Sequence, residues 1–286
     1  MNIFAKVLQV GRNAFKSGRP LRYVSRACLV KSGLCTALTQ RRRGYTLRFF
    51  PTIVNGAIHF CGQKHYQAEE DFIRSMLREG DCMIDVGCNI GLLSLAAKTA
   101  VGESGRCIAF EANPLIAHYA RCNSELNGGS IDVVNAAIGD TPGLIFLSAS
   151  SPDDVSFVLM QKPSSSYFTV AQHRLDDLIP EGRVRLLKID VEGFELNVLK
   201  GSRSLLDRCD FIWLEICDSF LSRFGASATE LIGLLHGHGF QLFQATFTDS
   251  YTLRVLPESA PHDFGSLSMY LAARPEHIFS GGPHDS

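Results

Sequence analysis

The stretch that decides the fold is Met83-Ile-Asp-Val-Gly-Cys-Asn-Ile-Gly91. An apolar run leads into two glycines, and the helical pattern LLSLAAKTA follows directly. A strand, a glycine turn and a helix in this order place the turn at the carboxyl end of the strand, where open α/β sheets bind ligands. Gly87 and Gly91 let the backbone approach a ligand closely. The stretch therefore predicts a ligand-binding turn, although an ordinary tight strand-to-helix turn would show the same pattern.

The sequence around this stretch repeats the same rhythm of apolar runs and helical patterns. The runs are CMIDV, CIAFE, IDVVNAA, VRLLKID and FIWLEI, with QLFQATF and SLSMYLAA later in the chain. Nearly continuous apolar strands joined by helical crossovers are typical of a parallel sheet that is covered on both faces. We therefore predict an α/β fold from residue 81 onward. Residues 148–166 interrupt the rhythm, and we expect a long surface loop there.

The composition indicates a globular protein and excludes several classes. Of the 286 residues, 45% are hydrophobic and 20% are charged. No run of about 18 apolar residues offers a membrane-spanning helix, and the early residues lack a cleavage pattern, so we expect no secretory signal peptide. Nine cysteines without a CxxC pair are typical of reduced thiols in a cytoplasmic protein. HExxH, Walker and GxSxG motifs are absent, which leaves hydrolase and triphosphatase activities without support.

The first part of the chain differs in charge from the rest. Residues 1–68 contain twelve Lys or Arg and no Asp or Glu, although the net charge of the chain is −1. We expect one or two basic amphipathic helices over 1–43, whose basic face could make peripheral contact with an anionic membrane or another polyanion. A helical cap with a solvated basic face and a transit peptide remain alternatives.

Local patterns set the expected boundaries. Residues 45–60 predict a hairpin around Asn55-Gly56, and Gln67–Leu77 predicts a helix. We therefore divide the chain into an N-terminal helical extension with a hairpin over 1–64, an α/β domain over 65–275 and a disordered tail over 276–286.

Two strand ends predict a nucleoside ligand. Glu111 ends CIAFE, 20 residues beyond Gly91, where a carboxylate can accept hydrogen bonds from both hydroxyls of a ribose. A dinucleotide motif would read GxGxxG, but this turn lacks the second and third glycines. Asp85 and Asn89 instead suit the ammonium and carboxylate groups of an amino-acid-bearing nucleoside.

Further candidates follow the next two strands. Asn113 can cap a helix that begins at Pro114, and it is also a candidate ligand contact. Asn135, Ala136 and Ala137 end the third strand, where the two alanines leave room for an adenine ring and Asn135 is a weaker candidate. A plain strand-end turn would explain these residues as well.

Charged residues cluster in the block Leu187-Lys-Ile-Asp-Val-Glu-Gly-Phe-Glu195. Strand periodicity places Lys188, Asp190 and Glu192 on one side, where burial is costly unless the charges pair or face a cleft. A structural ion pair and a reaction site are both consistent with this pattern. Glu215 adds a carboxylate at the end of FIWLEI, and together with Asp190 it could hold Mg²⁺. We expect no metal, because Lys188 already supplies a cation.

These blocks together resemble the FkbM family of S-adenosylmethionine-dependent methyltransferases, which belongs to the Rossmann-like class I methyltransferases. The resemblance covers about residues 65–245 and rests on IDVGCNIGLLSL, AFEANP, VVNAAIGD, RLDDL, LLKIDVEGFELNVLKGS and IWLEI. It implies a seven-stranded sheet with an antiparallel final strand, S-adenosylmethionine at the carboxyl ends of the first strands, and methylation of an oxygen. Cys88 and Ala112 depart from the usual family residues, and neither change is expected to abolish cofactor binding.

The resemblance leads to a hypothesis about the reaction. Asp190 or Glu192 would orient the acceptor hydroxyl and take its proton, and Lys188 would tune both carboxylates. The acceptor would be a hydroxyl on a sugar, a glycan, a lipid-linked glycan or a secondary metabolite. A nucleic-acid methyltransferase could use the basic segment against phosphates, but the chain lacks an NPPY-like block. A non-catalytic S-adenosylmethionine-binding protein and an NAD-dependent dehydrogenase would also use a fold of this kind.

Overall fold

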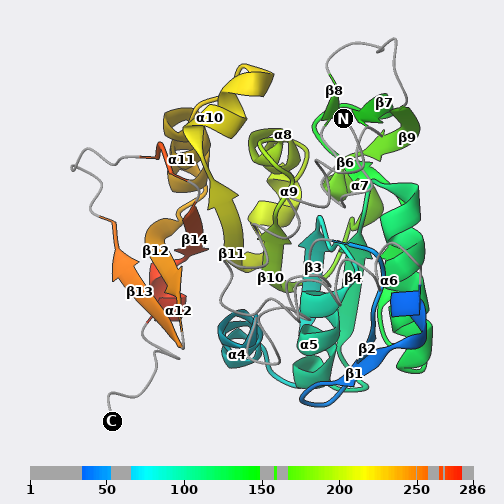
Figure 1. Ribbon diagram of the computed structural model, residues 1–286. Helices are drawn as coiled ribbons and strands as arrows, with labels where there is room; N and C mark the ends of the chain where they lie inside the picture. The colour runs from blue at the N-terminus through cyan, green and yellow to red at the C-terminus, as the bar shows by residue number, and fades with distance from the viewer. Residues whose placement is uncertain are drawn as a thin grey trace, which may run out of the picture.

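The computed structural model describes residues 34–52, 66–148, 158–159, 167–248, 250–256, 264–266 and 268–278. Its central element is an eight-stranded sheet (Figure 1). The strands follow the order β13 (Tyr251–Val255), β12 (Gln241–Phe247), β14 (Ser268–Ala273), β11 (Cys209–Ile216), β10 (Val184–Ile189), β3 (Cys82–Val86), β4 (Arg106–Phe110) and β5 (Asp132–Val134). The five strands from β11 to β5 are parallel, and β14 is antiparallel to both of its neighbours.

The predicted α/β fold with seven strands and an antiparallel last strand is confirmed, and the structure adds one strand. All seven apolar runs form strands of this sheet. The additional strand, β13, pairs only with β12 at the edge. Four of its five residues are exposed, so it has no buried face from which an apolar pattern could arise.

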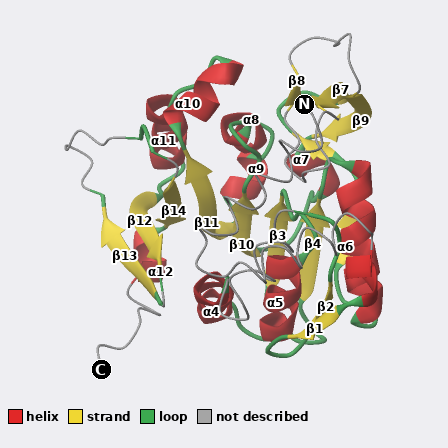
Figure 2. Ribbon diagram, viewed as in Figure 1, coloured by secondary structure: helices red, strands yellow, loops and turns green. Residues whose placement is uncertain are grey.

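Helices lie on both sides of the sheet (Figure 2). One side carries α4 (Gln67–Met76), α5 (Leu92–Val101) and α6 (Pro114–Leu126), and the other carries α7 (Leu175–Leu178), α8 (Glu195–Lys200), α9 (Arg203–Leu206) and α11 (Ala228–Gly237). Short helices complete the chain: η1 (Leu34–Ala37), α10 (Asp218–Leu221), η2 (Ser222–Phe224) and α12 (Pro275–Ile278). The predicted helix after the N-terminal region is confirmed as α4.

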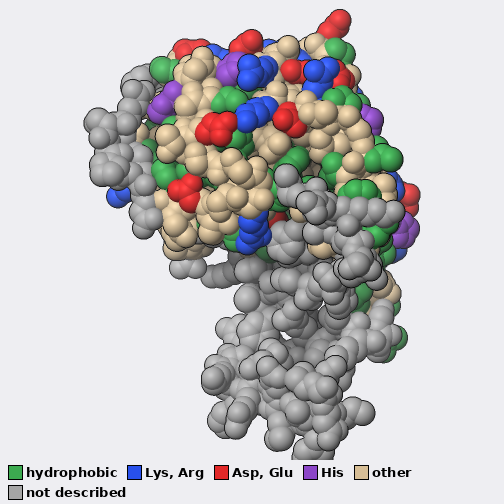
Figure 3. All heavy atoms as spheres, turned by 90° about the horizontal axis from the view of Figure 1, so that it is seen from above, with side chains coloured by type: hydrophobic (Ala, Val, Ile, Leu, Met, Phe, Trp, Pro, Cys, Tyr) green, Lys and Arg blue, Asp and Glu red, His purple; other side chains and the backbone are tan. Residues whose placement is uncertain are grey.

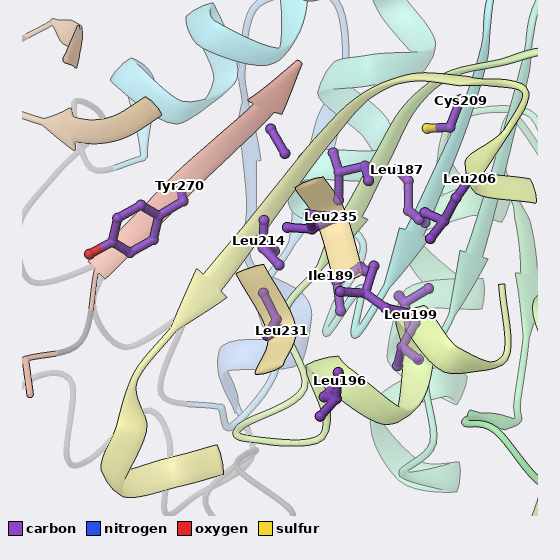
Figure 4. Close-up of a cluster of buried hydrophobic side chains, with 14 of the residues drawn as sticks. Leu187, Ile189, Leu196, Leu199, Leu206, Cys209, Leu214, Leu231, Leu235 and Tyr270 are labelled. Atoms are coloured by element: carbon purple, nitrogen blue, oxygen red, sulfur yellow. The ribbon is translucent and has the colours of Figure 1, made fainter. Parts of the chain in front are cut away.

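Alternate residues of each strand enter different cores, because successive side chains of a strand point to opposite faces. Met83 and Leu186 belong to the cluster beneath α4 and α5. Ile84 and Leu187 belong to the cluster beneath α8, α9 and α11, part of which Figure 4 shows. Trp213, which the strand pattern places in the core, is 1% exposed. Burial on both faces explains why the strands are apolar almost throughout.

A second, four-stranded sheet lies between β5 and β10 in the sequence. It has the order β6 (Ala137–Ile138), β9 (Tyr167–His173), β7 (Gly143–Ser148) and β8 (Val158–Leu159). The loop expected over residues 148–166 is wrong at Ser148, which closes β7, and at residues 158–159, which form β8 and pair with β7. The other residues of that expected loop lie outside the described part of the chain.

The N-terminal hairpin differs from the one expected. Strand β2 (Thr46–Arg48) pairs with β1 (Thr39–Arg41), which precedes it, whereas the sequence pattern predicted a partner after Asn55-Gly56. Positive φ at Gly44 (89°) permits the observed turn. Asn55-Gly56 and most of the basic segment over 1–43 lie outside the described residues, so membrane or polyanion contact stays a prediction.

The hairpin is attached to the rest of the fold by buried polar contacts. Asn127 exchanges hydrogen bonds of 2.8 and 2.7 Å with the backbone of Thr46, and Asn123 accepts one from the backbone N–H of Arg48. Glu70 of α4 accepts a hydrogen bond from Tyr45 at 2.7 Å and pairs with Arg42. The described hairpin therefore packs against α4 and α6, and the domain boundary after residue 64 stays a prediction.

The last described residues of the chain are helical. The tail expected to be disordered from residue 276 is wrong at 276–278, because these residues form most of α12, where His277 contacts Asp210 at 3.2 Å. Within the described residues, no helix combines the length and apolar character needed to cross a membrane.

Candidate functional site

A cavity of about 340 Å³ opens at the carboxyl ends of β3, β4, β10 and β11. This volume lies in the range of small-molecule sites. Its lining combines the turn after β3, the end of β4, the alanines after β5 and the charged loop after β10. Seen from above, the described part of the surface at this end of the molecule carries acidic and basic side chains intermixed (Figure 3).

The turn after β3 is held against the loop after β10. Gly87 has φ +81°, and a Cβ placed there would lie 1.9 Å from the carbonyl oxygen of Asp190. The backbone N–H groups of Gly87 and Cys88 both donate to the carbonyl of Phe110. Only glycine fits so close to another backbone segment. The approach of a ligand to Gly87 stays a prediction.

The remaining turn residues have different surroundings. Asn89 has φ 52° and lines the cavity. Gly91, with φ +81°, begins α5 and packs against Ile131 and Ala120 instead of lining the cavity. Ile90, Leu92 and Leu93 do line it, so the N-terminal end of α5 faces the cavity. A helix N-terminus favours an anionic group nearby.

Glu111 lies at the end of β4 and lines the cavity. One carboxyl oxygen accepts from the backbone N–H of Asn89 at 3.0 Å and the other from that of Asn113 at 2.8 Å. Burial raises the pKa of Glu111 to about 7, although both backbone hydrogen bonds act in the opposite direction. Each oxygen has a further lone pair, so the carboxylate can accept two hydroxyl groups side by side.

Asn113 and Asn135 support this corner without lining the cavity. Asn113 caps α6 by accepting from the backbone N–H groups of Leu115 and Ile116. Asn135 donates to the carbonyls of Glu111 and Ala112 at 2.8 and 2.9 Å. The capping role predicted for Asn113 is confirmed, while its direct contact with a ligand stays a prediction.

An apolar wall forms another part of the cavity lining. Ala136 and Ala137 line the cavity, as the sequence predicts for residues beside an adenine ring, and Phe110 lies close by in its lining. Leu147 of β7 and Val158 of β8 complete the wall from the second sheet. The sequence analysis missed these last two residues, because nothing in their local pattern shows that the second sheet folds back over the alanines.

Lys188 connects the two charged strands from within the core. Lys188 and Asp85 are register partners on adjacent parallel strands. The Lys188 Nζ lies 3.1 Å from Asp85 and 3.4 Å from Asp190. Burial alone would lower the pKa of Lys188, but the two carboxylates raise it above its ordinary value. The structure thus brings together the predicted ion pair and the cavity, since both Lys188 and Asp190 line it.

Asp85 does not line the cavity, contrary to its expected place beside a ligand. Its side chain is 0% exposed, and its two oxygens bind Lys188 and the hydroxyl of Ser94, the latter at 2.5 Å. Because the side chain has no exposed surface, a ligand could reach Asp85 only if neighbouring atoms moved. Asp85 therefore holds Lys188 in position from the far side.

Glu192 lines the cavity from a loop and not from the predicted strand. Strand β10 ends at Ile189, so strand periodicity does not extend to Glu192, which adopts φ 57° in the following loop. Glu195 holds this loop by accepting from the backbone N–H groups of Val191 and Gly193 at 3.2 and 3.1 Å. Burial raises the pKa of Glu195 to about 7. Asp190 and Glu192 both line the cavity nonetheless.

Glu215 also lines the cavity, from the end of β11. It is 8% exposed, and burial together with the nearby carboxylates of Asp190, Glu192 and Glu195 raises its pKa to about 9. Asp190 and Glu215 do not suit a divalent cation, because the Lys188 ammonium already lies against Asp190. In the described ranges, no three His, Cys, Asp or Glu side chains are grouped so that they could hold a metal ion.

A known family model matches the part of the chain that carries these features. The family model described as the methyltransferase FkbM domain matches residues 85–242, which is more than half of the chain. The chain belongs to the FkbM methyltransferase family. The matched range begins at Asp85 and includes Glu111, the Lys188 block and Glu215. Methyl transfer is therefore the reaction class of this enzyme.

Two methyltransferases are similar to this chain in sequence. The hexuronic acid methyltransferase AglP of Haloferax volcanii is 29% identical over 180 residues, which span 60% of this chain and 71% of that protein. The 31-O-demethyl-FK506 methyltransferase FkbM of Streptomyces tacrolimicus is 28% identical over 198 residues, which span 57% of this chain and 74% of that protein.

Solved structures resemble this FkbM-family chain more loosely. An rRNA methylase of Streptococcus thermophilus is 12% identical, with a TM-score of 0.41 over 72% of this chain and 93% of that one. An S-adenosylmethionine-dependent O-methyltransferase of Thermotoga maritima is 18% identical, with a TM-score of 0.40 over 72% of this chain and 64% of that one. Likeness at this level carries no argument about the reaction or the acceptor.

Proposed function

We propose that this FkbM-family enzyme uses S-adenosylmethionine to methylate a hydroxyl group on a sugar, a glycan, a lipid-linked glycan or a secondary metabolite. The observation that carries the cofactor assignment is Glu111, a carboxylate fixed at the end of β4 by the backbone N–H groups of Asn89 and Asn113. Such a carboxylate suits the two hydroxyls of a ribose. The acceptor class is supported by the two relatives, whose names specify a hexuronic acid and 31-O-demethyl-FK506 as substrates.

The lining of the cavity fits the other parts of this cofactor. Ala136 and Ala137 leave space that the apolar side chains of Phe110, Leu147 and Val158 enclose, which suits an adenine ring. Asn89 and the N-terminal end of α5 offer polar groups to an amino acid carboxylate. Gly87 permits the close backbone approach. Gly91, Asp85 and Asn113 would act indirectly, by shaping the turn, holding Lys188 and fixing Glu111.

S-adenosylmethionine, when bound, supplies a methyl group that is already activated by a sulfonium. The chain must therefore position the acceptor oxygen and help to remove its proton. Asp190 is 39% exposed at its side chain, pairs with Lys188 and faces the cavity beside Glu192. We assign removal of this proton to Asp190 or Glu192. A positioned base typically accelerates such a reaction by roughly 10²- to 10⁴-fold. Lys188 would hold the Asp190 carboxylate in place through their ion pair.

Transfer of a labelled methyl group from S-adenosylmethionine into fractionated cell extract tests this function. The wild-type chain is compared with Glu111→Gln, which keeps the shape of the side chain but leaves one of the two backbone N–H groups facing an amide nitrogen. We expect label in a glycan, lipid or small-molecule fraction, and cofactor affinity about ten- to a hundredfold weaker in the variant. Glu103→Gln, at an exposed position, is the matched control.

The fractions also distinguish this function from its rivals. Label in nucleic acid would contradict the proposed acceptor and favour a nucleic-acid methyltransferase. Tight cofactor binding with no label in any fraction would favour a non-catalytic binding protein. Equal cofactor affinity in Glu111→Gln and wild type would show that Glu111 does not hold the ribose. Loss of transfer in excess chelator would show that a metal is required after all.

A further inference from the structure

One carboxyl group in the cavity has no partner among the described residues. Glu215 is 8% exposed and lines the cavity, yet no hydrogen bond or ion pair joins its side chain to any residue that the structure describes. The other buried carboxyls nearby all have partners: Asp85 binds Lys188 and Ser94, Glu111 binds two backbone N–H groups, and so does Glu195. The oxygens of this carboxyl group are accessible from the cavity, so a ligand bound there can pair with them.

Lys188 cannot serve as that partner. Its ammonium group donates to Asp85 at 3.1 Å and to the carbonyl of Gly87 at 3.3 Å, and it lies 3.4 Å from Asp190. It is the one basic residue among the described residues that line the cavity. On the other side of Glu215, the register partner in β14 is Met269, which carries no charge. An ionised Glu215 would therefore lack a counterion.

The surrounding charges determine the protonation state. Burial and the carboxylates of Asp190, Glu192 and Glu195 raise the pKa of Glu215 to about 9, and Lys188 offsets this only in part. At neutral pH the side chain is then a carboxylic acid with an O–H donor. A ligand oxygen that accepts a hydrogen bond from this O–H inside the cavity would contribute affinity.

We propose that Glu215 is a specificity-determining residue that donates a hydrogen bond to the methyl acceptor, and that it selects an uncharged polyol. One acceptor hydroxyl would lie against Asp190 or Glu192, and the neighbouring oxygen would accept from Glu215. An anionic acceptor is disfavoured, because it would lie beside the carboxylates of Asp190 and Glu192. In the charge of its acceptor this chain would therefore differ from the relative named for a hexuronic acid. This inference rests on the proposed function and specifies its acceptor.

Saturation-transfer NMR with the full chain and S-adenosylhomocysteine tests the proposal. The probes are methyl β-D-glucopyranoside, a neutral polyol, and methyl β-D-glucuronide, its anionic counterpart. We expect the wild type to bind the glucopyranoside, Glu215→Gln to retain binding through its N–H donor, and Glu215→Leu to bind about tenfold more weakly. Glu103→Leu, at an exposed position, is the control. Rescue by the amide distinguishes donation from packing.

Three results would overturn the proposal. They are equal binding by Glu215→Leu, equal binding of the glucuronide, or no saturation transfer from the glucopyranoside. Infrared difference spectra between wild type and Glu215→Gln at pH 7 give a test that needs no acceptor, because a protonated carboxyl has its own carbonyl band. Absence of that band would also overturn it. Glucopyranoside binding without methyl transfer into any extract fraction would instead contradict the proposed function and leave the role of Glu215 intact.

Discussion

A single ammonium group, that of Lys188, serves a buried and a half-exposed carboxylate at the same time. Asp85 is 0% exposed, and its side chain accepts hydrogen bonds from Lys188 and Ser94. Asp190 lies toward the cavity on the other side of the ammonium. Asp85 is thus a positioning residue, and the pair links the stability of the core to the shape of the site.

Replacing Lys188 tests this link. Lys188→Met leaves Asp85 buried without a cation, and we expect a loss of about 3–5 kcal/mol in the free energy of unfolding. The double variant Asp85→Asn, Lys188→Met should recover much of that loss, since no buried charge remains. Urea unfolding of the two single variants and the double variant gives the coupling energy. Lys200→Met, which breaks the more exposed pair with Glu230, should change stability by less than about 1 kcal/mol. An equal loss in both lysine variants would contradict this reasoning.

At the scale of elements, the turn after β3 and the loop after β10 depend on each other. The carbonyl of Asp190 occupies the space that a Cβ on residue 87 would need, and the N–H of Asp190 donates to the carbonyl of Val86. A displacement of the turn would therefore move Asp190 and Glu192 relative to Glu111.

A comparison of Gly87→Ala with Gly182→Ala separates two causes of lost stability. One is the clash with the carbonyl of Asp190, and the other is the left-handed backbone conformation. Gly87 and Gly182 have φ of +81° and +89°, but only Gly87 would meet other atoms within 4 Å. We expect Gly182→Ala to lose about 1–2 kcal/mol from the left-handed backbone alone. Gly87→Ala should lose at least about 2 kcal/mol more and bind S-adenosylmethionine more weakly. Denaturant unfolding and calorimetric titration measure the two effects, and similar losses in the two variants would refute the importance of the contact.

The sequence predicts those elements whose residues carry a periodic pattern. The seven apolar strands and α4 were predictable because burial on two faces or one face sets their period. The pairing of β2 with β1 was not, because β1 has only three residues and its middle one alone is partly buried. Of the site, the sequence predicts Glu111, Lys188, Asp190, Glu192 and Glu215 at the cavity. The burial of Asp85 and the approach of Leu147 depend on contacts between distant segments.

For the whole molecule, the buried acids determine how stability depends on pH. The pKa values of Glu111 and Glu195 are raised to about 7 and that of Glu215 to about 9, whereas unfolded glutamates titrate near 4.3. Between these values the folded chain holds protons that the unfolded chain has released. The stability contributed by these groups is therefore complete below about pH 4 and is lost as the pH rises to about 9.

Glu215→Gln isolates the dependence of stability on pH between about pH 7 and pH 9. From pH 7 to 9, where Glu111 and Glu195 give up their protons and Glu215 still holds its own, the wild type should lose up to about 1.4 kcal/mol per pH unit relative to the variant. Free energies of unfolding in denaturant at pH 5, 7 and 9 give the comparison. A difference between wild type and variant that stays constant over these three pH values would show that Glu215 is ionised in the folded state.

The position of β14 has a consequence for synthesis on the ribosome. This strand lies between β11 and β12, although both are translated before it. Until residue 273 has left the exit tunnel, the apolar edges of β11 and β12 have no strand between them, and unpaired edges invite aggregation. The nascent chain therefore cannot complete its sheet during translation of the earlier strands, and we expect it to depend on chaperones up to its last strand.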